Sequence, residues 1–133
     1  MTMTTDHPNT AAVKATLDSL ITGVSGHAFD VLDRTYHKDM RTYLLTDDGV
    51  LMQNDKPGFM EHVKAAMSQM GDPNPWAEYH LVEADDTHGH ILISRKNNVT
   101  NRKQLVTLSI DFTFEEDRWQ VTREVIMTRN EVN

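Results

Sequence analysis

Apolar and polar residues alternate strictly along the segment Leu105–Phe114. The apolar positions of this alternation are Val106, Leu108, Ile110, Phe112 and Phe114. A period of two, held over about ten residues, is typical of a strand with one buried face. We therefore predict a long strand over Lys103–Glu115 whose apolar face forms the concave, core-facing side of a sheet.

Similar but shorter patterns predict further strands on both sides of this one. They cover Arg41–Thr46, Val50–Gln53, Trp76–Asp85, His90–Lys96 and Arg118–Arg129. The connections Asp47-Asp48-Gly49, Asp86–Gly89, Asn97-Asn98 and Glu116-Asp117 are read as turns. Because short turns join strands that are neighbours in the chain, we expect these neighbours to pair antiparallel.

Three segments show the helical period instead. The first has apolar residues at Val13, Leu17, Leu20, Ile21 and Val24, with Asn9 or Thr10 as a cap and Gly23 and Gly26 at its end. A short helix over His27–Thr35 follows, with Ser25 as its cap. A third begins at Asn54 or Asp55, has Pro57 in its first turn, continues through Met70 and stops at Gly71.

The composition indicates one globular domain. At 133 residues, with 38% hydrophobic residues, the chain is long enough to bury a core, and we assign residues 1–9 to a flexible N-terminus and 10–129 to a single domain. It has no cysteine, no signal-peptide pattern and no apolar run near the roughly 20 residues of a membrane span. These features predict a cytoplasmic protein without a membrane partner.

The charge argues against nucleic acid as a partner. The formal net charge is −7, and a surface of that sign repels phosphate backbones. The basic cluster surrounds the predicted Asn97-Asn98 turn and is read as a solvated hairpin end. Its members are Arg95, Lys96, Arg102 and Lys103.

Three short motifs and their order resemble the nuclear transport factor two-like fold, and within it the SnoaL-like and putative lumazine-binding proteins. The motifs are Gly26-His27-Ala28-Phe29-Asp30, Tyr36-His37-Lys38-Asp39-Met40 and Trp119-Gln120-Val121. The resemblance covers about residues 10 to 128. It implies an α+β fold in which the N-terminal helices are cupped by a strongly curved antiparallel sheet, a cone-like or cystatin-like roll, and it implies homodimers formed across the sheet.

The resemblance does not fix one function, because this fold carries isomerases, dehydratases, polyketide cyclases and proteins without known activity. Ketosteroid-isomerase-like members use a carboxylate base on the first strand and a tyrosine on the first helix. The corresponding positions here are approximately Leu44 and Ser19, which cannot perform that chemistry.

Arg123 is the first candidate for a site residue. It lies at the same alternate positions as Trp119, Val121, Val125 and Met127, which predicts that it shares their inner face of the last strand. There it would bind a ligand carboxylate or an enolate, and the alternative is a structural ion pair or an edge residue that reaches solvent. Phe112 and Trp119, which lie on the predicted apolar faces, are further candidate ligand contacts.

His80 is the candidate base. It shares the predicted face of Trp76, Val82 and Ala84, so it would act in a cavity near neutral pH; we favour the alternative of an exposed or dimer-contact histidine. Tyr36 and Tyr43 flank the entry to the first strand, where a phenol hydroxyl would donate to a ligand carbonyl or would only pack.

His37 and Asp39 are two residues apart and are read as capping a helix exit rather than as an acid–base pair. The stripe Thr107, Ser109, Asp111 and Thr113 is assigned to solvent or to a dimer interface. His88 and His90 lack a third ligand at a fixed spacing, so we expect no metal site, and no motif predicts a cofactor.

The first hypothesis for function is therefore a homodimer that binds a small, largely apolar organic molecule between the helices and the sheet. The enzymatic alternative is an isomerase-like or cyclase-like proton transfer with His80 or His37 as base, and Tyr43 and Arg123 stabilising an oxyanion. A third hypothesis is a protein-interaction module that uses the outer face of the sheet.

Overall fold

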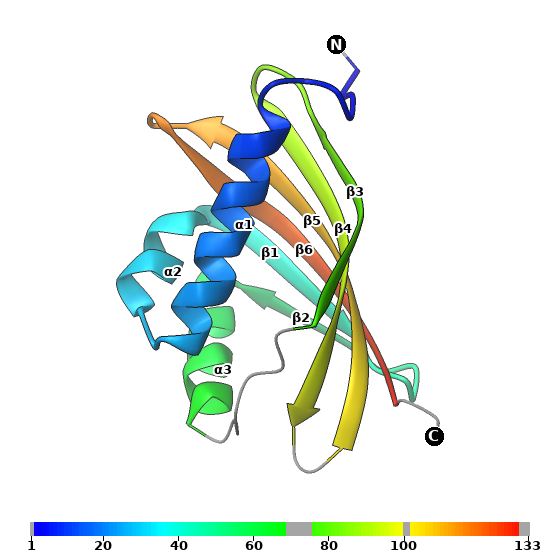
Figure 1. Cartoon of the computed structure of the whole chain (residues 1–133). Helices are drawn as coiled ribbons and strands as arrows, with labels where there is room; N and C mark the ends of the chain where they lie inside the picture. The colour runs from blue at the N-terminus through cyan, green and yellow to red at the C-terminus, as the bar shows by residue number, and fades with distance from the viewer. Residues whose placement is uncertain (1, 69–75, 100–101, 131–133) are drawn as a thin grey trace.

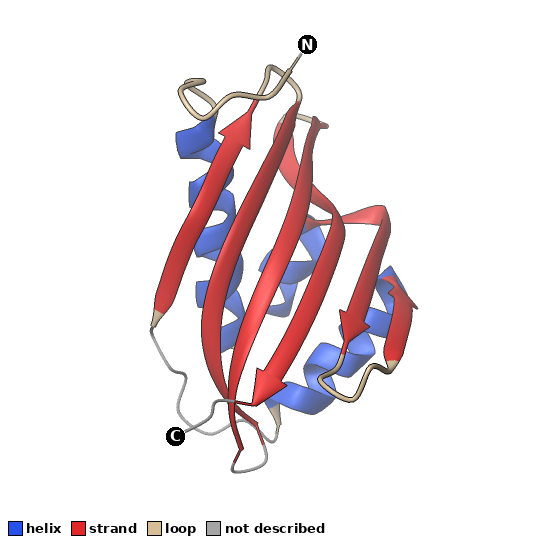
Figure 2. Cartoon of the chain, turned by 90° about the vertical axis from the view of Figure 1, so that its right-hand side faces the viewer, coloured by secondary structure: helices blue, strands red, loops and turns tan. Residues whose placement is uncertain are grey.

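The computed structural model describes residues 2–68, 76–99 and 102–130 and contains three helices packed on one face of a bent sheet (Figure 1). The elements are α1 (Thr10–Ser25), α2 (Phe29–Thr35), β1 (Tyr36–Leu45), β2 (Leu51–Asp55), α3 (Lys56–Met67), β3 (Ala77–Ala84), β4 (His88–Val99), β5 (Arg102–Glu115) and β6 (Arg118–Asn130). Figure 2 views the sheet from its outer face, with the helices behind it. This is the predicted α+β class.

The six strands lie in the order β2-β1-β6-β5-β4-β3, and the sheet does not close into a barrel. The pairs that are neighbours in the chain are antiparallel, as the short turns predict. The expectation of a wholly antiparallel sheet is wrong, because β1 pairs with β6 in parallel. This contact joins segments about 80 positions apart, which no turn signal in the sequence encodes.

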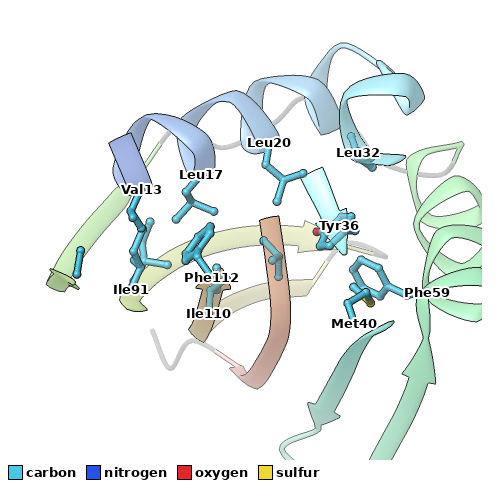
Figure 3. Close-up of a cluster of buried hydrophobic side chains, with 13 residues drawn as sticks. Val13, Leu17, Leu20, Leu32, Tyr36, Met40, Phe59, Ile91, Ile110 and Phe112 are labelled. Carbon is cyan, nitrogen blue, oxygen red and sulfur yellow. The ribbon is translucent and has the colours of Figure 1, made fainter. Parts of the chain in front are cut away.

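The core lies between α1 and the inner face of the sheet, as the alternation in β5 predicts (Figure 3). Ile110 and Phe112 are each only 1% exposed, and they face Leu17 of α1 across the core. Phe114 is an exception at 41% exposure, and it lies close to the turn of the β5–β6 hairpin.

The helix α1 lies very close to the sheet where Val13 packs against Gly89 of β4. A Cβ added to Gly89 of β4 would lie 2.6 Å from Cγ2 of Val13. Real Cβ atoms do not come this close, so only glycine allows α1 to sit this near to β4. On the same side of the molecule, Thr4 exchanges two backbone hydrogen bonds of 2.9 Å with Ala84, and these connect the N-terminal segment to β3.

The helix boundaries follow their capping signals only in part. The side chain of Asp55 accepts a hydrogen bond from the Gly58 amide at 3.0 Å and caps α3, with Pro57 in the first turn, as predicted. Ser25 does not cap α2; it is the last residue of α1, and the cap position of α2 is Ala28. The predicted stop at Gly71 and the connection 72–75 lie outside the described residues.

The strands β1 and β4 extend several residues beyond their predicted bounds. Tyr36–Asp39, which was expected to be a helix exit, already belongs to β1, and His37 and Asp39 therefore lie on a strand. The expected turn at Asn97-Asn98 is part of β4, where these residues pair with Gln104 and Lys103 of β5. The turn at Glu116-Asp117 is confirmed, since Glu115 and Arg118 pair directly on either side of it.

Within the described parts of the chain, none of the helices combines the length and the apolar character that crossing a bilayer would require.

Candidate functional site

A cavity of about 250 Å³ lies between α1, α3 and the inner face of the sheet. Most of its lining is aliphatic or aromatic, as in sites for small organic ligands. The lining residues are Leu17, Leu20, Ile21, Val24, Tyr36, Phe59, His62, Val63, Ala66, Met67, Ile93, Arg95, Val106, Leu108, Ile110, Glu124 and Ile126. Four of them carry a polar or charged group: Tyr36, His62, Arg95 and Glu124.

Glu124 lies on the inner face because of a β-bulge in β6. Asp111 of β5 pairs with Arg123, but the next residue, Phe112, pairs with Val121, so Thr122 has no partner in the register. One extra residue reverses which side of the sheet the following side chains occupy. Glu124 consequently points inward, beside Ile110 of β5 in the register.

Glu124 has little contact with water, and its carboxyl group has no polar partner among the described residues. The residue is 4% exposed and makes neither a hydrogen bond nor an ion pair with any described residue. Burial disfavours the charged form and raises the pKa of Glu124 from 4.5 to about 7. Glu124 is therefore a carboxyl group in an apolar cavity that changes protonation near neutral pH.

Tyr36, the first residue of β1, brings a hydroxyl group to the same cavity. The residue is 4% exposed, and its ring packs edge-on against Phe59 of α3, with ring centres 5.1 Å apart (Figure 3). Burial raises the pKa of Tyr36 well above its usual value, and the negative charge of Glu124 raises it further. The hydroxyl group therefore stays protonated and available as a hydrogen-bond donor.

Arg95 lies on β4, in the inner-face series that begins with Ile91 and Ile93. Its Nε is buried and has no hydrogen-bond acceptor in the parts of the chain that the structure describes. Burial also lowers the pKa of Arg95, although the guanidinium group remains charged. His62 contributes an exposed imidazole from α3.

Of the six residues that the sequence nominates as ligand contacts, Tyr36 lines the cavity. The prediction that Arg123 lies on the inner face is wrong. The bulge at Thr122 turns Arg123 outward, where its side chain is 60% exposed and its Nε donates to Oδ2 of Asp111 at 2.9 Å. This is the ion-pair alternative, and Arg123 does not line the cavity between the helices and the sheet.

His80 and Tyr43 also lie on the outer face of the sheet. In β3 a second bulge leaves His80 unpaired between Tyr79 and Leu81, so His80 does not share the face of Val82. The His80 imidazole is instead hydrogen-bonded to Ser94 Oγ at 2.7 Å. Tyr43 pairs with Val125 and points away from the cavity, because its neighbour Thr42 is the residue that pairs with Glu124.

The remaining nominated residues lie elsewhere in the molecule. His37 is hydrogen-bonded to Oε2 of Glu115 at 2.7 Å, which ties β1 to the end of β5. Trp119 packs against Phe114 on the β5–β6 hairpin. Phe112 lies in the core under α1. Catalytic or binding roles for these residues stay predictions without a shared site.

The outer face contains one arrangement that resembles a catalytic triad. His90 is hydrogen-bonded through Nε2 to Ser109 Oγ at 2.9 Å and through Nδ1 to Oε1 of Glu83 at 3.0 Å. Ser109 lies on a strand paired on both sides, so the backbone N–H groups around it belong to the sheet and cannot form an oxyanion hole. We interpret this row as cross-strand hydrogen bonding that satisfies polar groups.

Glu124, Arg95 and His62 line the cavity but are not among the residues that the sequence nominates. For Arg95 a signal existed, since Ile91, Ile93 and Arg95 alternate and share a face, but the arginine was assigned to a basic hairpin end. Glu124 had no such signal, because an unbroken alternation through β6 selects Arg123 instead. No group of three metal-binding side chains occurs among the residues that the structure describes.

No protein-family model matches the sequence. No curated protein matches it either. Solved structures do resemble the fold. An NTF2-like protein of unknown function from Silicibacter pomeroyi has a TM-score of 0.72 at 15% identity, with 90% of this chain and 94% of that chain covered.

Two more structures are similar over almost the whole chain. A conserved protein from Planctomyces limnophilus has a TM-score of 0.75 at 14% identity, with 94% of this chain and 99% of that chain covered. A ketosteroid isomerase-like protein from Erwinia carotovora atroseptica has a TM-score of 0.69 at 13% identity, covering 92% and 97% of the two chains. At such identities the likeness concerns architecture alone, and this chain has the NTF2-like fold.

Proposed function

We propose that this protein binds a small, largely apolar organic molecule in the cavity between the helices and the sheet, with a polar group of the ligand at Glu124. The observation that carries the proposal is the carboxyl group of Glu124, which is buried and has no partner among the described residues. Leaving such a group unpaired costs about 1–3 kcal/mol. A ligand that pairs with it recovers this energy, whereas a structural role would require a partner in the protein.

The neighbouring Tyr36 supports the same proposal. Its hydroxyl group is a donor, and a protonated Glu124 is a donor as well. Two donors in an apolar cavity suit a ligand with an acceptor oxygen, such as a carbonyl or hydroxyl group. A cavity of about 250 Å³ lies slightly below the roughly 300–1,000 Å³ of pockets for drug-sized ligands, which favours a small molecule.

Binding of three ligands of one shape tests the proposal. We expect 4-phenylbutan-2-one and 4-phenylbutan-2-ol to bind more tightly than butylbenzene, measured by ligand-observed NMR or calorimetry. Glu124→Leu should remove this preference and improve the binding of butylbenzene. Glu78→Gln, on an exposed position of β3, is the matched control that keeps the preference. Equal binding of all three ligands to both proteins, or no binding, contradicts the proposal.

Proton transfer is the second candidate function, and the raised pKa of Glu124 favours it. A base or acid works best when its pKa lies near the operating pH, and Glu124 has a pKa of about 7. Glu124 would move a proton next to a ligand carbonyl while Tyr36 donates a hydrogen bond to its oxygen. The general class is the one expected from the sequence, but with different residues in place of His80, His37, Tyr43 and Arg123.

Exchange of ligand protons separates catalysis from binding alone. In deuterated water, the wild-type protein should accelerate deuterium incorporation next to the carbonyl group of 4-phenylbutan-2-one, and Glu124→Gln should abolish the acceleration. Binding without any exchange would leave the binding function and remove the catalytic one.

The homodimer and the cytoplasmic location stay predictions. The outer face offers an apolar row for a dimer contact, in which Leu51 pairs with Leu45 and Leu45 pairs with Met127, each at least 40% exposed. Sedimentation of the wild-type chain and of Met127→Lys tests this, since a lysine in the contact should produce monomers.

A further inference from the structure

We propose that Arg95 binds an anionic group of the ligand, so that the cavity selects small apolar molecules with a carboxylate at one end. This inference rests on the proposed binding function and goes further by naming the chemical class of the ligand. Among the described residues, no acidic side chain forms an ion pair with Arg95 and no acceptor meets its Nε.

The unpaired Nε of Arg95 favours a ligand-binding role over a structural one. An arginine that serves the fold usually donates its N–H groups to a carboxylate or a backbone oxygen, because a buried donor without an acceptor is destabilising. Arg95 lines the cavity and has a buried Nε without an acceptor. A carboxylate matches the planar guanidinium group in two parallel hydrogen bonds and would satisfy it.

The groups around Arg95 do not replace such a ligand. In the sheet, its neighbours are Ala77 of β3 and Val106 of β5, neither of which has a polar side chain. The carboxylate of Asp18 on α1 accepts a hydrogen bond from the Tyr79 hydroxyl at 2.5 Å. The Tyr79 ring in turn makes a cation–π contact with Lys14, whose Nζ lies 4.7 Å from the ring centre.

The cavity therefore has two chemically different ends. Arg95 is opposite Val106 and Glu124 is opposite Ile110, four residues further along β5 and on its other side. With strands about 4.8 Å apart and a rise of about 3.3 Å per residue, the two backbone positions are about 16 Å apart. Apolar residues cover the floor between them, Ile93, Leu108 and Ile126 among them. This order suits a carboxylate, an apolar body and a second polar group.

The overall charge of the chain makes a preference for anionic ligands informative about Arg95. With a formal net charge of −7 the chain as a whole does not attract anions. A preference for an anionic ligand must then come from a local cation. Arg95 is the arginine that lines the cavity, whereas Arg123 lies on the opposite face of the sheet.

The test uses the full chain and three ligands of one shape: 4-phenylbutanoate, 4-phenylbutanamide and 4-phenylbutylamine. For the wild-type protein we expect the carboxylate to bind about tenfold more tightly than the amide, by calorimetry, and the amine to bind most weakly. Arg95→Gln should weaken carboxylate binding about tenfold and leave amide binding within about twofold. Arg123→Gln removes the same charge from the outer face and should change neither affinity.

Folding and charge are controlled separately. Circular dichroism and a thermal melt establish that Arg95→Gln is folded, and Arg95→Lys should retain part of the carboxylate preference because it keeps the charge. If carboxylate and amide bind wild type equally, or if Arg123→Gln rather than Arg95→Gln removes the preference, the role of Arg95 is refuted while ligand binding stands. If none of the three ligands binds, the proposed binding function fails together with the inference.

Discussion

Val121 and Glu124 lie on the same face of β6 although three positions separate them, because Thr122 forms a bulge between them. In a regular strand, residues an odd number of positions apart point to opposite faces. Val121 is fully buried in the core and Glu124 lines the cavity. The bulge therefore allows β6 to contribute side chains to both the core and the cavity. Bulges are common beside functional sites, where they redirect a side chain.

The first prediction concerns the pH dependence of stability. The pKa of Glu124 is about 7 in the folded chain and 4.5 for an unperturbed carboxyl group. The folded state therefore binds more protons than the unfolded state between these values, and stability falls as pH rises from 4.5 to about 7. The loss amounts to about 3 kcal/mol. Urea unfolding of the wild type and of Glu124→Gln, at several pH values, measures it.

Glu124→Gln keeps the shape of the side chain without a titrating group, so its stability should decline less over this range. Comparing the two proteins cancels the contribution of every other titrating residue. Glu78→Gln, which removes an exposed carboxyl group from β3, should behave like the wild type. Parallel pH profiles for the wild type and Glu124→Gln would show that Glu124 does not titrate near neutrality.

The second prediction tests the contact between Gly89 and Val13. Gly89→Ala adds a methyl group where only 2.6 Å separates its position from Val13 Cγ2, so α1 has to move away from β4. We expect a loss of about 1–3 kcal/mol in the free energy of unfolding. The double variant Gly89→Ala/Val13→Ala should lose less than the sum of the two single variants. Additive losses would show that the two residues do not compete for space.

The third prediction concerns the turn between β5 and β6. Glu116 and Asp117 have φ angles of 55° and 61°, which is the left-handed region that favours glycine. Asp117→Gly should relieve this strain and raise the free energy of unfolding by about 0.5–1 kcal/mol. Gly49→Ala is the reverse control, since Gly49 has a φ of 80° and should lose stability when replaced. A less stable Asp117→Gly would contradict the argument.

The sequence predicts the elements of this fold better than the faces of its strands. The alternation in β5 correctly places Ile110 and Phe112 in the core, because a pattern of period two directly reflects burial on one side. The same reasoning fails in β6 and β3, where Thr122 and His80 are single extra residues. Neither is a glycine or another residue that marks a bulge, and one extra residue changes every later assignment.

The candidate site was predictable only in its position between helices and sheet. Tyr36 is nominated because the entry to the first strand lines the pocket in proteins that this chain resembles, and it does line the cavity. Glu124 depends on a bulge, and the parallel contact of β1 with β6 depends on tertiary packing, which local patterns do not encode. Arg95 shows a different limit, since a single charged residue near other charged residues resembles a solvated turn even when its alternation points inward.

The last prediction separates a binding role of Arg95 from a structural one. Replacing a residue that stabilises the fold lowers the free energy of unfolding. An arginine with a buried, unpaired Nε instead destabilises the protein in the absence of ligand, so replacing it should raise that free energy. Arg95→Met keeps a long apolar side chain in the cavity and removes the unpaired donor. We expect the free energy of unfolding to rise by about 1 kcal/mol, measured in urea without ligand. Arg41→Met, at an exposed position of β1, should stay within about 0.5 kcal/mol of the wild type. A clear loss of stability in Arg95→Met would mean that the guanidinium group supports the fold, and the gain expected here would indicate a residue retained for what it binds.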